Sequence, residues 1–209
     1  DQAILLNSYL PHFLEAKTKG TSSKVIHIST DCVFSGEKGG YTEKDRKDGI
    51  GFYAQSKALG ELQNNKDLTI RTSIIGPEIK GKGIGLFHWF SQQTGEVGGY
   101  KKAIWTGVTV IELMKAVKVV FEQDLVGLIH LVNQETISKF DLLHLFKKHY
   151  NADHILVGQN STFVSDKSVI RTNFDFDYEV ASYDQMIKEM KEWMKEYDSI
   201  YKTFYHKVL

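Results

Sequence analysis

The sequence contains little of what would mark a secreted, membrane-bound or nucleic-acid-binding protein. Among its 209 residues Cys32 is the only cysteine, which excludes an internal disulfide and favours a reducing compartment, with the cytoplasm as the default. The 26 basic and 26 acidic residues balance, so charge gives no reason to expect a nucleic acid or an anionic membrane as partner. No apolar run approaches the roughly 18–20 residues of a membrane-spanning helix. With 42% apolar and 25% charged residues, the chain is expected to be globular.

The beginning of the chain lacks further features. There is no initiator methionine, and there is no basic segment or small-residue cleavage site of a signal peptide. No Gly-x-Gly-x-x-Gly or Gly-x-x-Gly-x-x-Gly turn, which would bind phosphate, occurs before residue 53. Such a turn normally precedes residues of the kind found at 29–31 and 53–57. We therefore expect the chain to begin in the middle of a fold.

The first 76 residues alternate between helical and strand-like patterns. The patterns predict, in order, a helix over 3–16, a strand over 25–28, a loop over 35–48, a helix over 51–63 and a strand over 68–75. Pro11 predicts a kink or a break in the first helix. This order is half of a doubly wound sheet. We therefore predict an α/β fold with a partial doubly wound, parallel, Rossmann-like sheet over residues 1–76.

Residues 77–209 are predicted to form mainly a smaller substrate-binding lobe and a C-terminal helix. The patterns predict helices over 87–93, 109–123, 138–150 and 183–204, and short strands over 127–132 and 154–157. The glycine-rich loop 81–85 lacks Walker spacing, so we do not interpret it as a phosphate cradle. Ser138 is expected to cap its helix. The apolar stripe on the last helix indicates core packing, although its spacing also suits the helix–helix seam of a homodimer.

Three side chains form the chemical centre of the sequence. The hydroxyl of Thr30, or that of Ser29, follows the first strand and can bind a carbonyl oxygen and stabilise the alkoxide that forms on it. Tyr53 and Lys57 are four residues apart, so they share one face of a helix. A free tyrosine titrates at about pH 10, and a lysine ammonium held close to it is expected to lower this pKa. Hydroxyl, tyrosine and lysine in this order indicate carbonyl reduction with a nicotinamide cofactor.

The placement of these residues supports that interpretation. A Tyr-x-x-x-Lys spacing is weak evidence by itself, because amphipathic helices carry it by chance with a core tyrosine and a solvated lysine. In doubly wound sheets, however, ligands bind beyond the carboxyl ends of the strands. The polar residues 29–31 and 72–73 follow the two predicted strands, so both are expected at that edge of the sheet.

Several segments resemble the dTDP-4-dehydrorhamnose reductase family, which are extended short-chain dehydrogenases/reductases that act on nucleotide-linked sugars. The specific ones are STDCVFSG at 29–36, YTEKD at 41–45 and YAQSKALGE at 53–61. Supporting ones are LTIRTSIIG at 68–76, IWTGVT at 104–109, GLIHL at 127–131 and ISKFD at 137–141. The resemblance extends to about residue 193.

The resemblance implies roles for individual residues. Thr30 would be the catalytic hydroxyl, Tyr53 the proton donor and Lys57 its partner, with NADP or NAD as cofactor. The residues expected near the nicotinamide, besides Tyr53 and Lys57, are Ser29, Thr72, Ser73 and Ile74. Those expected near a nucleotide-sugar substrate are Val33, Phe34 and Trp105, and Lys167 is a candidate to grip its diphosphate.

The chain departs from the family pattern in three places. Cys32 replaces a tyrosine common in its block, and Ala54 replaces the usual glycine after the catalytic tyrosine. The cofactor-binding first half is missing, so the chain is expected to be a fragment that lacks roughly the first 70–90 residues of a domain of typical size. Such a fragment would bind a dinucleotide poorly.

Other candidate sites are weaker. Cys32 has no evident base, and the neighbouring Asp31 would raise rather than lower the pKa of its thiol, so we expect a small, partly buried residue. The eight histidines show no zinc spacing, and no metal site is predicted. His27 and His130 are expected to be core residues of strands. The charge run 43–48 indicates a surface loop or a lid over the substrate, and Lys167 fits a solvated loop as well as a diphosphate site.

Three functions remain open from the sequence. The first is an NAD(P)H-dependent reductase of a nucleotide-linked 4-keto sugar, in cell-surface polysaccharide synthesis. The second is a non-catalytic NADP-binding regulatory subunit of the same fold, which the retained proton donor disfavours. The third is a sugar-nucleotide epimerase or dehydratase. A dehydratase needs an acid–base pair beside the tyrosine, which Ala54 and Gln55 do not offer.

Overall fold

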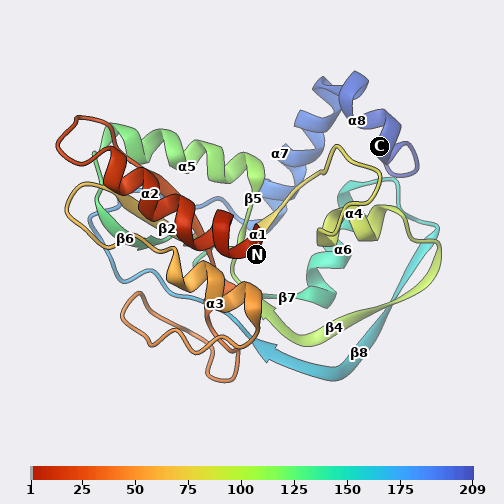
Figure 1. Cartoon of the computed structure of the whole chain (residues 1–209). Coiled ribbons are helices and arrows are strands. Elements are labelled where there is room, and N and C mark those ends of the chain that lie inside the picture. The colour runs from red at the N-terminus through yellow and green to blue at the C-terminus, as the bar shows by residue number, and fades with distance from the viewer. Residues whose placement is uncertain (1) are drawn as a thin grey trace.

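Three parallel strands form the main sheet, which is not confined to residues 1–76 because its third strand lies at 127–130 (Figure 1). The computed structural model describes residues 2–209. Strands β1 (Ile26–Thr30), β2 (Leu68–Thr72) and β6 (Gly127–His130) lie in the order β1-β2-β6, and both pairs are parallel. Their carboxyl ends therefore lie at one edge of the sheet, as the sequence predicts for an α/β fold of this kind.

The two faces of this sheet have different chemistry. Ile28, Ile70 and Ile129 are register partners in the main core, which they share with residues of α5 (Val110–Glu122). The residues next to them in sequence point to the other face, because side chains alternate along a strand. That polar face lies toward α3 (Phe52–Leu59), whose Lys57 side chain bonds to β1. One face is thus an apolar core and the other carries polar groups toward the helix with the predicted tyrosine and lysine.

The first predicted helix runs through Pro11 without a break but changes its type before it. Helix α1 (Gln2–Ile4) runs into a π-helical turn, η1 (Leu5–Tyr9), and α2 (Leu10–Lys17) follows with Pro11 in its first turn. Proline is tolerated there because the first turn leaves its N–H groups without partners inside the helix. The predicted break is not found: the chain stays helical from residue 2 to residue 17, and the change of helix type comes just before the proline.

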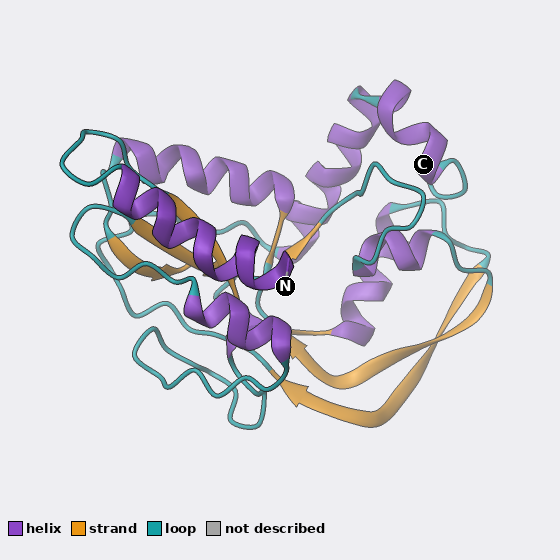
Figure 2. Ribbon diagram, in the orientation of Figure 1, coloured by secondary structure: helices purple, strands orange, loops and turns teal. Residues whose placement is uncertain are grey.

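The second part of the molecule is built around a long two-stranded ribbon (Figure 2). Strands β4 (Gly95–Trp105) and β8 (Ile155–Asp166) are parallel to each other, and the short β7 (Ile137–Ser138) pairs antiparallel with the end of β4. The sequence analysis missed β4 and gave β8 only four residues. The reason is physical: six of the eleven residues of β4 and six of the twelve of β8 are exposed, and the buried positions of β4 include Gly99 and Ala103, so the apolar pattern of both strands is weak.

Four helices complete this part: α4 (Leu86–Ser91), α6 (Lys139–His149), α7 (Tyr183–Glu196) and α8 (Asp198–Tyr205). Of these, α6 packs against both strands of the ribbon, α4 and α7 pack against α6, and α8 packs against α7. The predicted cap of α6 is confirmed, since the Ser138 hydroxyl accepts from the Asp141 N–H. The predicted helix 183–204 is in fact two helices, because the chain turns at Tyr197. The stripe residues Met186 and Met190 are buried in the main core, whereas Ile200 is 48% exposed.

A short sheet of two strands, each two residues long, connects the main sheet to the rest of the chain. The predicted strand 68–75 is interrupted at Ser73, and β3 (Ile74–Ile75) then leaves the main sheet to pair in parallel with β5 (Val108–Thr109). This step places Ser73 and Ile74 beside the carboxyl end of β2. Within residues 2–209, no helix combines the length and the apolar character needed to cross a membrane.

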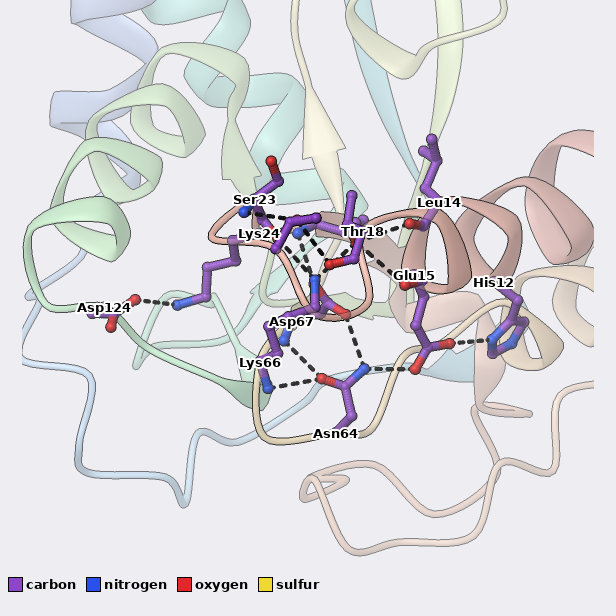
Figure 3. Close-up of polar contacts among 12 residues, drawn as sticks. His12, Leu14, Glu15, Thr18, Ser23, Lys24, Asn64, Lys66, Asp67 and Asp124 are labelled. Atoms are coloured by element: carbon purple, nitrogen blue, oxygen red, sulfur yellow. Dashed lines mark hydrogen bonds and ion pairs between the residues drawn. The ribbon is translucent and has the colours of Figure 1, made fainter.

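A polar network ties α2 to the amino ends of the strands (Figure 3). Asp67 is fully buried and accepts from Val25 N at 2.8 Å, from Asn64 Nδ2 at 3.0 Å and from Lys66 Nζ at 2.7 Å. Asn64 also donates to Glu15 of α2 at 2.6 Å. The network lies at the edge of the sheet opposite the predicted site and is structural.

His27 makes the stability of the fold dependent on pH. It lies on β1 as predicted, but its Nε2 is buried without a hydrogen-bond partner among the described residues. Burial, followed by the charge of Lys57, lowers the pKa of His27 to about 4. An unfolded histidine titrates at about 6.5, so the unfolded chain binds the extra proton between these values. Stability is therefore fully present above pH 6.5 and falls as the pH drops toward 4.

The expected loss is at most about 3 kcal/mol, because His27 is only partly shielded from solvent. Urea unfolding of the wild-type chain and of H27Q between about pH 7 and pH 4.5 measures it. The variant should show the shallower fall over this range, because its side chain does not titrate. Equal slopes in the two proteins would show that His27 does not carry the effect.

Candidate active site

One cavity brings together the residues predicted for catalysis and cofactor binding. It has a volume of about 440 Å³ and lies at the carboxyl ends of β1 and β2. Its lining contains all seven of these residues: Ser29, Thr30, Tyr53, Lys57, Thr72, Ser73 and Ile74. Ile28, Asp31 and Cys32 complete the wall. Residues up to 46 positions apart in sequence therefore meet where a doubly wound sheet binds its ligands.

Tyr53 and Lys57 enter the cavity from α3. Tyr53 is 54% exposed, so its phenol is open to a bound molecule. The Lys57 ammonium donates a hydrogen bond of 2.6 Å to the carbonyl oxygen of Ile28. An ammonium has three donors, so this bond leaves two for other oxygens. The lysine is thus anchored to β1 at the edge of the cavity.

The pKa of Tyr53 differs from the sequence-based expectation. It is raised rather than lowered, mainly by burial, and the negative charges of Cys32 and Asp31 would raise it further while the Thr30 hydroxyl opposes the change. The charge of Lys57 is not among the causes of this shift, and its ammonium donates to the Ile28 carbonyl. Tyr53 is therefore protonated at neutral pH, which is the state that a proton donor needs.

Thr30 ends β1 and begins the short turn that follows it. Its Oγ1 accepts from Cys32 N and donates to Asp31 Oδ1, both at 3.1 Å. Burial raises the pKa of Asp31, while Lys139, Thr30, Ser73 and Lys167 act against it. Burial and the charge of Asp31 also raise the pKa of the Cys32 thiol, in the direction the sequence analysis expects. The turn thus presents a hydroxyl, a shielded carboxyl group and an unreactive thiol.

The remaining wall is less polar. The Ser29 hydroxyl faces away from the opening, since it donates to Glu61 Oε1 at 2.7 Å and Ser29 is only 3% exposed. Ile74 is 42% exposed and gives the cavity an apolar surface. A second cavity, of about 500 Å³, lies at the amino ends of the strands beside Asp67 and contains none of the predicted residues.

The geometry agrees with the comparison to known families. The model of the RmlD substrate binding domain matches residues 1–169. The chain belongs to this family. Membership places it among enzymes of the short-chain dehydrogenase/reductase type. No curated protein sequence matches the chain.

Solved structures share the fold over most of their length. A hypothetical dTDP-4-dehydrorhamnose reductase from Sulfolobus tokodaii is 26% identical with a TM-score of 0.69, and the match covers 88% of this chain and 70% of that one. The reductase from Bacillus anthracis in complex with NADP is 21% identical with a TM-score of 0.74, covering 90% and 72%. UDP-glucose 4-epimerase from Thermotoga maritima with UDP-glucose is 17% identical with a TM-score of 0.73, covering 93% and 71%. The last two likenesses show the fold alone.

Two residues predicted to lie near the substrate are core residues in this member of the RmlD family. Val33 and Phe34 are 1% and 0% exposed and form a small core with Tyr41, Val132 and Val169. Phe34 stacks on Tyr41 with ring centroids 4.3 Å apart. Neither side chain lines the cavity, so the structure gives them a packing role. The sequence could not show this, because an apolar residue after a strand fits either place.

Truncation of Phe34 should therefore affect stability. Phe34→Ala removes a fully buried ring and is expected to cost about 3–5 kcal/mol of unfolding free energy. Phe121→Ala is a matched control, because Phe121 is 65% exposed on α5 and its loss should change stability by less than about 0.5 kcal/mol. Urea unfolding midpoints measure both. A Phe34→Ala protein as stable as the control would contradict the packing role.

Two lysines and a tryptophan lie near Asp31 but outside the wall of the cavity. Trp105 is 2% exposed, and the Lys139 ammonium lies 4.6 Å from its ring centre. Lys139 and Lys167 both act on the pKa of Asp31, so both charges are near that end of the cavity. Trp105 and Lys167 do not line the cavity itself. Lys139 was missed by the sequence analysis, which treated its segment only as the start of a helix.

The charge run 43–48 is an anchored loop. Glu43 accepts from His130 N at 3.1 Å and from Thr172 N at 2.9 Å. Lys47 Nζ donates to the Ala58 carbonyl at 2.8 Å and to Glu61 at 3.1 Å. These bonds hold the loop against the sheet and α3, which favours a fixed wall over a lid. His130 is fully buried and hydrogen-bonded, as predicted for a core histidine.

Proposed function

We propose that the chain is the catalytic and substrate-binding part of an NAD(P)H-dependent reductase of a nucleotide-linked 4-keto sugar. The observation that carries this is the meeting of Thr30, Tyr53 and Lys57 in one cavity at the carboxyl ends of parallel strands. A binding module has no need of a proton donor at this place. We place the enzyme in the cytoplasm, in the synthesis of cell-surface polysaccharide.

The residues present fit the nicotinamide end of the cofactor. Two free donors on Lys57 suit the ribose hydroxyls, and the exposed apolar side chain of Ile74 suits one face of a nicotinamide ring. No glycine is among the residues that line this cavity, so the pyrophosphate has no cradle there. Residues 1–76 are proposed to hold the riboside end only, with NADP or NAD as the cofactor.

The reduction follows from the positions of the side chains. When bound, the reduced cofactor supplies a hydride to the carbonyl carbon. The Tyr53 phenol gives its proton to the carbonyl oxygen as negative charge develops there, and its raised pKa keeps that proton in place beforehand. The Thr30 hydroxyl turns from Asp31 toward the same oxygen and stabilises the charge. Lys57 fixes the ribose and adds a positive charge to the site.

Residues 77–209 are proposed to hold the rest of the substrate. A cavity of about 720 Å³ lies between β4, β8, α4 and α6, with the aromatic side chains of Trp89, Tyr100 and Phe163 in its wall. Aromatic rings suit the stacking of a nucleotide base. Lys139 lines this cavity and also acts on Asp31, so its ammonium is placed for the diphosphate between base and sugar.

The test is turnover with a defined substrate. The protein is incubated with a nucleotide-linked 4-keto sugar and with NADPH or NADH at high concentration, because the cavity is proposed to hold only the riboside end of the cofactor. Oxidation of the cofactor is followed by its absorbance. The proposal expects oxidation in step with formation of a 4-hydroxy sugar. Product formed without net oxidation would indicate an epimerase. Tight cofactor binding with no product from any sugar nucleotide would indicate a regulatory subunit.

A further inference from the structure

A buried carboxylate joins the candidate active site to the sheet. Glu61 follows the end of α3 and is only 6% exposed. Arg71 on β2 donates from Nε and Nη2 to its two oxygens, both at 2.7 Å. Ser29 Oγ donates to Oε1 at 2.7 Å, and Lys47 Nζ donates to Oε2 at 3.1 Å. Donors from β1, β2 and the loop before α3 therefore converge on one carboxylate.

The carboxylate is fixed by a row of side chains across the sheet. Ser29, Arg71 and His130 are register partners on the three strands and share the polar face. Arg71 is 1% exposed, and its Nη1 lies 3.3 Å from Nε2 of His130. A guanidinium held on both sides in this way has one orientation, and its planar fork matches the carboxylate in two parallel bonds. Glu61 is thus held in a single place.

Strand β1 also carries the carbonyl group to which Lys57 is hydrogen-bonded. Lys57 donates to the Ile28 carbonyl, and Glu61 accepts from the hydroxyl of the next residue, Ser29. The two bonds together fix the end of α3 on adjacent residues of β1. Burial lowers the pKa of Lys57, and the charge of Glu61 opposes that effect. Burial would also raise the pKa of Glu61, but the hydrogen bonds and charge of Arg71 outweigh it, so the carboxylate is ionised.

We propose that Glu61 is a positioning residue, which holds the Lys57 ammonium and the adjoining end of β1 in the places that the candidate site requires. Arg71 in turn holds Glu61. The role of this arrangement in cofactor binding rests on the proposed function. The electrostatic coupling between Glu61 and Lys57 is independent of that function. Neither residue faces the cavity, so both act through others.

Stability alone does not account for this arrangement. A buried ion pair brings a large desolvation cost, and hydrophobic residues of similar volume often give an equally stable or more stable protein. The carboxylate of this pair accepts a hydrogen bond from Ser29, which lines the cavity of the candidate site. A second buried carboxylate, Asp67, lies at the other end of β2 and has no such connection (Figure 3). The two carboxylates therefore provide a matched comparison.

The test is the double variant E61M/R71M in the full chain. Removing both charges leaves neither partner buried alone, so the variant is expected to fold. The carbon-13 signal of Lys57 Cε should titrate at lower pH than in the wild type. The affinity for NADPH, measured by fluorescence, should fall by about tenfold, because Glu61 no longer fixes the position of the Lys57 ammonium.

The control is D67N. It should lower the unfolding midpoint and leave both the Lys57 titration and the NADPH affinity as in the wild type. The other titratable groups on elements packed against α3 are Tyr9, His12, His27, Asp31, Cys32 and Lys47, and Tyr53 lies on α3 itself. None of these is altered in either variant, so a change in the Lys57 titration belongs to Glu61 and Arg71.

The outcomes separate the inference from the proposed function. A folded E61M/R71M protein with the wild-type Lys57 titration and NADPH affinity would overturn the inference. If the wild type binds no NADPH but the Lys57 signal still moves in the variant, the positioning role holds and the cofactor assignment fails. If the double variant does not fold, the single variant S29A tests the inference instead. It removes only the hydrogen bond from β1 to the Glu61 carboxylate. Unchanged NADPH affinity in S29A would then overturn the inference.

Discussion

Replacement of Tyr53 by phenylalanine should lower kcat for carbonyl reduction by about 10²–10⁴-fold, the usual contribution of a positioned proton donor. The variant loses one hydroxyl from a side chain that is 54% exposed, so the fold and the cofactor affinity should be kept. At neutral pH the phenol holds the proton that the alkoxide needs, and water would have to replace it.

The measurement is the rate of NADPH oxidation with a nucleotide-linked 4-keto sugar. Tyr9→Phe is the matched control, because Tyr9 lies on η1, is 57% exposed and does not line the cavity. Its rate should equal that of the wild type. A Tyr53→Phe protein that turns over as fast as the control would remove Tyr53 from the mechanism.

Replacement of Arg71 alone by methionine should cost about 3–5 kcal/mol of unfolding free energy, because it leaves the Glu61 carboxylate buried without its main partner. Arg71 makes two of the three bonds of 2.7 Å to that carboxylate and is almost completely buried. The two remaining donors, Ser29 and Lys47, cannot replace its charge at this depth. The single variant should therefore be less stable than the double variant E61M/R71M.

Urea unfolding measures this effect. K47M is the matched control at the same carboxylate, since the Lys47 side chain is 30% exposed and its ion pair should contribute no more than about 1 kcal/mol. An unfolding midpoint of R71M equal to that of the wild type would show that Glu61 does not depend on Arg71.

The sequence predicts the elements whose apolar residues have one buried side. The pattern for α5 was found because its core face repeats at helical spacing, and β1 and β2 were found because buried parallel strands are runs of branched residues. The strand β4 was not found, since it is exposed on most of its length and contains three glycines. Tertiary context, not local pattern, makes it a strand.

The candidate site was likewise predicted only in part from the sequence. Order and spacing along the chain were enough to predict that Thr30, Tyr53 and Lys57 meet, because the carboxyl ends of parallel strands lie at one edge. The predicted direction of the Tyr53 pKa was wrong, since the sequence does not reveal how far the phenol is buried, and burial is the main cause of the rise. The pairing of Glu61 with Arg71 was also out of reach, although the spacing of Glu61 four residues after Lys57 was a signal.

The central claim is that the cavity around Thr30, Tyr53 and Lys57 reduces a carbonyl group. The most direct measurement uses NADPH or NADH carrying deuterium at the transferred position and mass spectrometry of the sugar product. The account predicts one deuterium on the carbon that held the carbonyl oxygen, with one cofactor oxidised for each product. Product without deuterium, or deuterium that returns to the cofactor without net reduction, would contradict it.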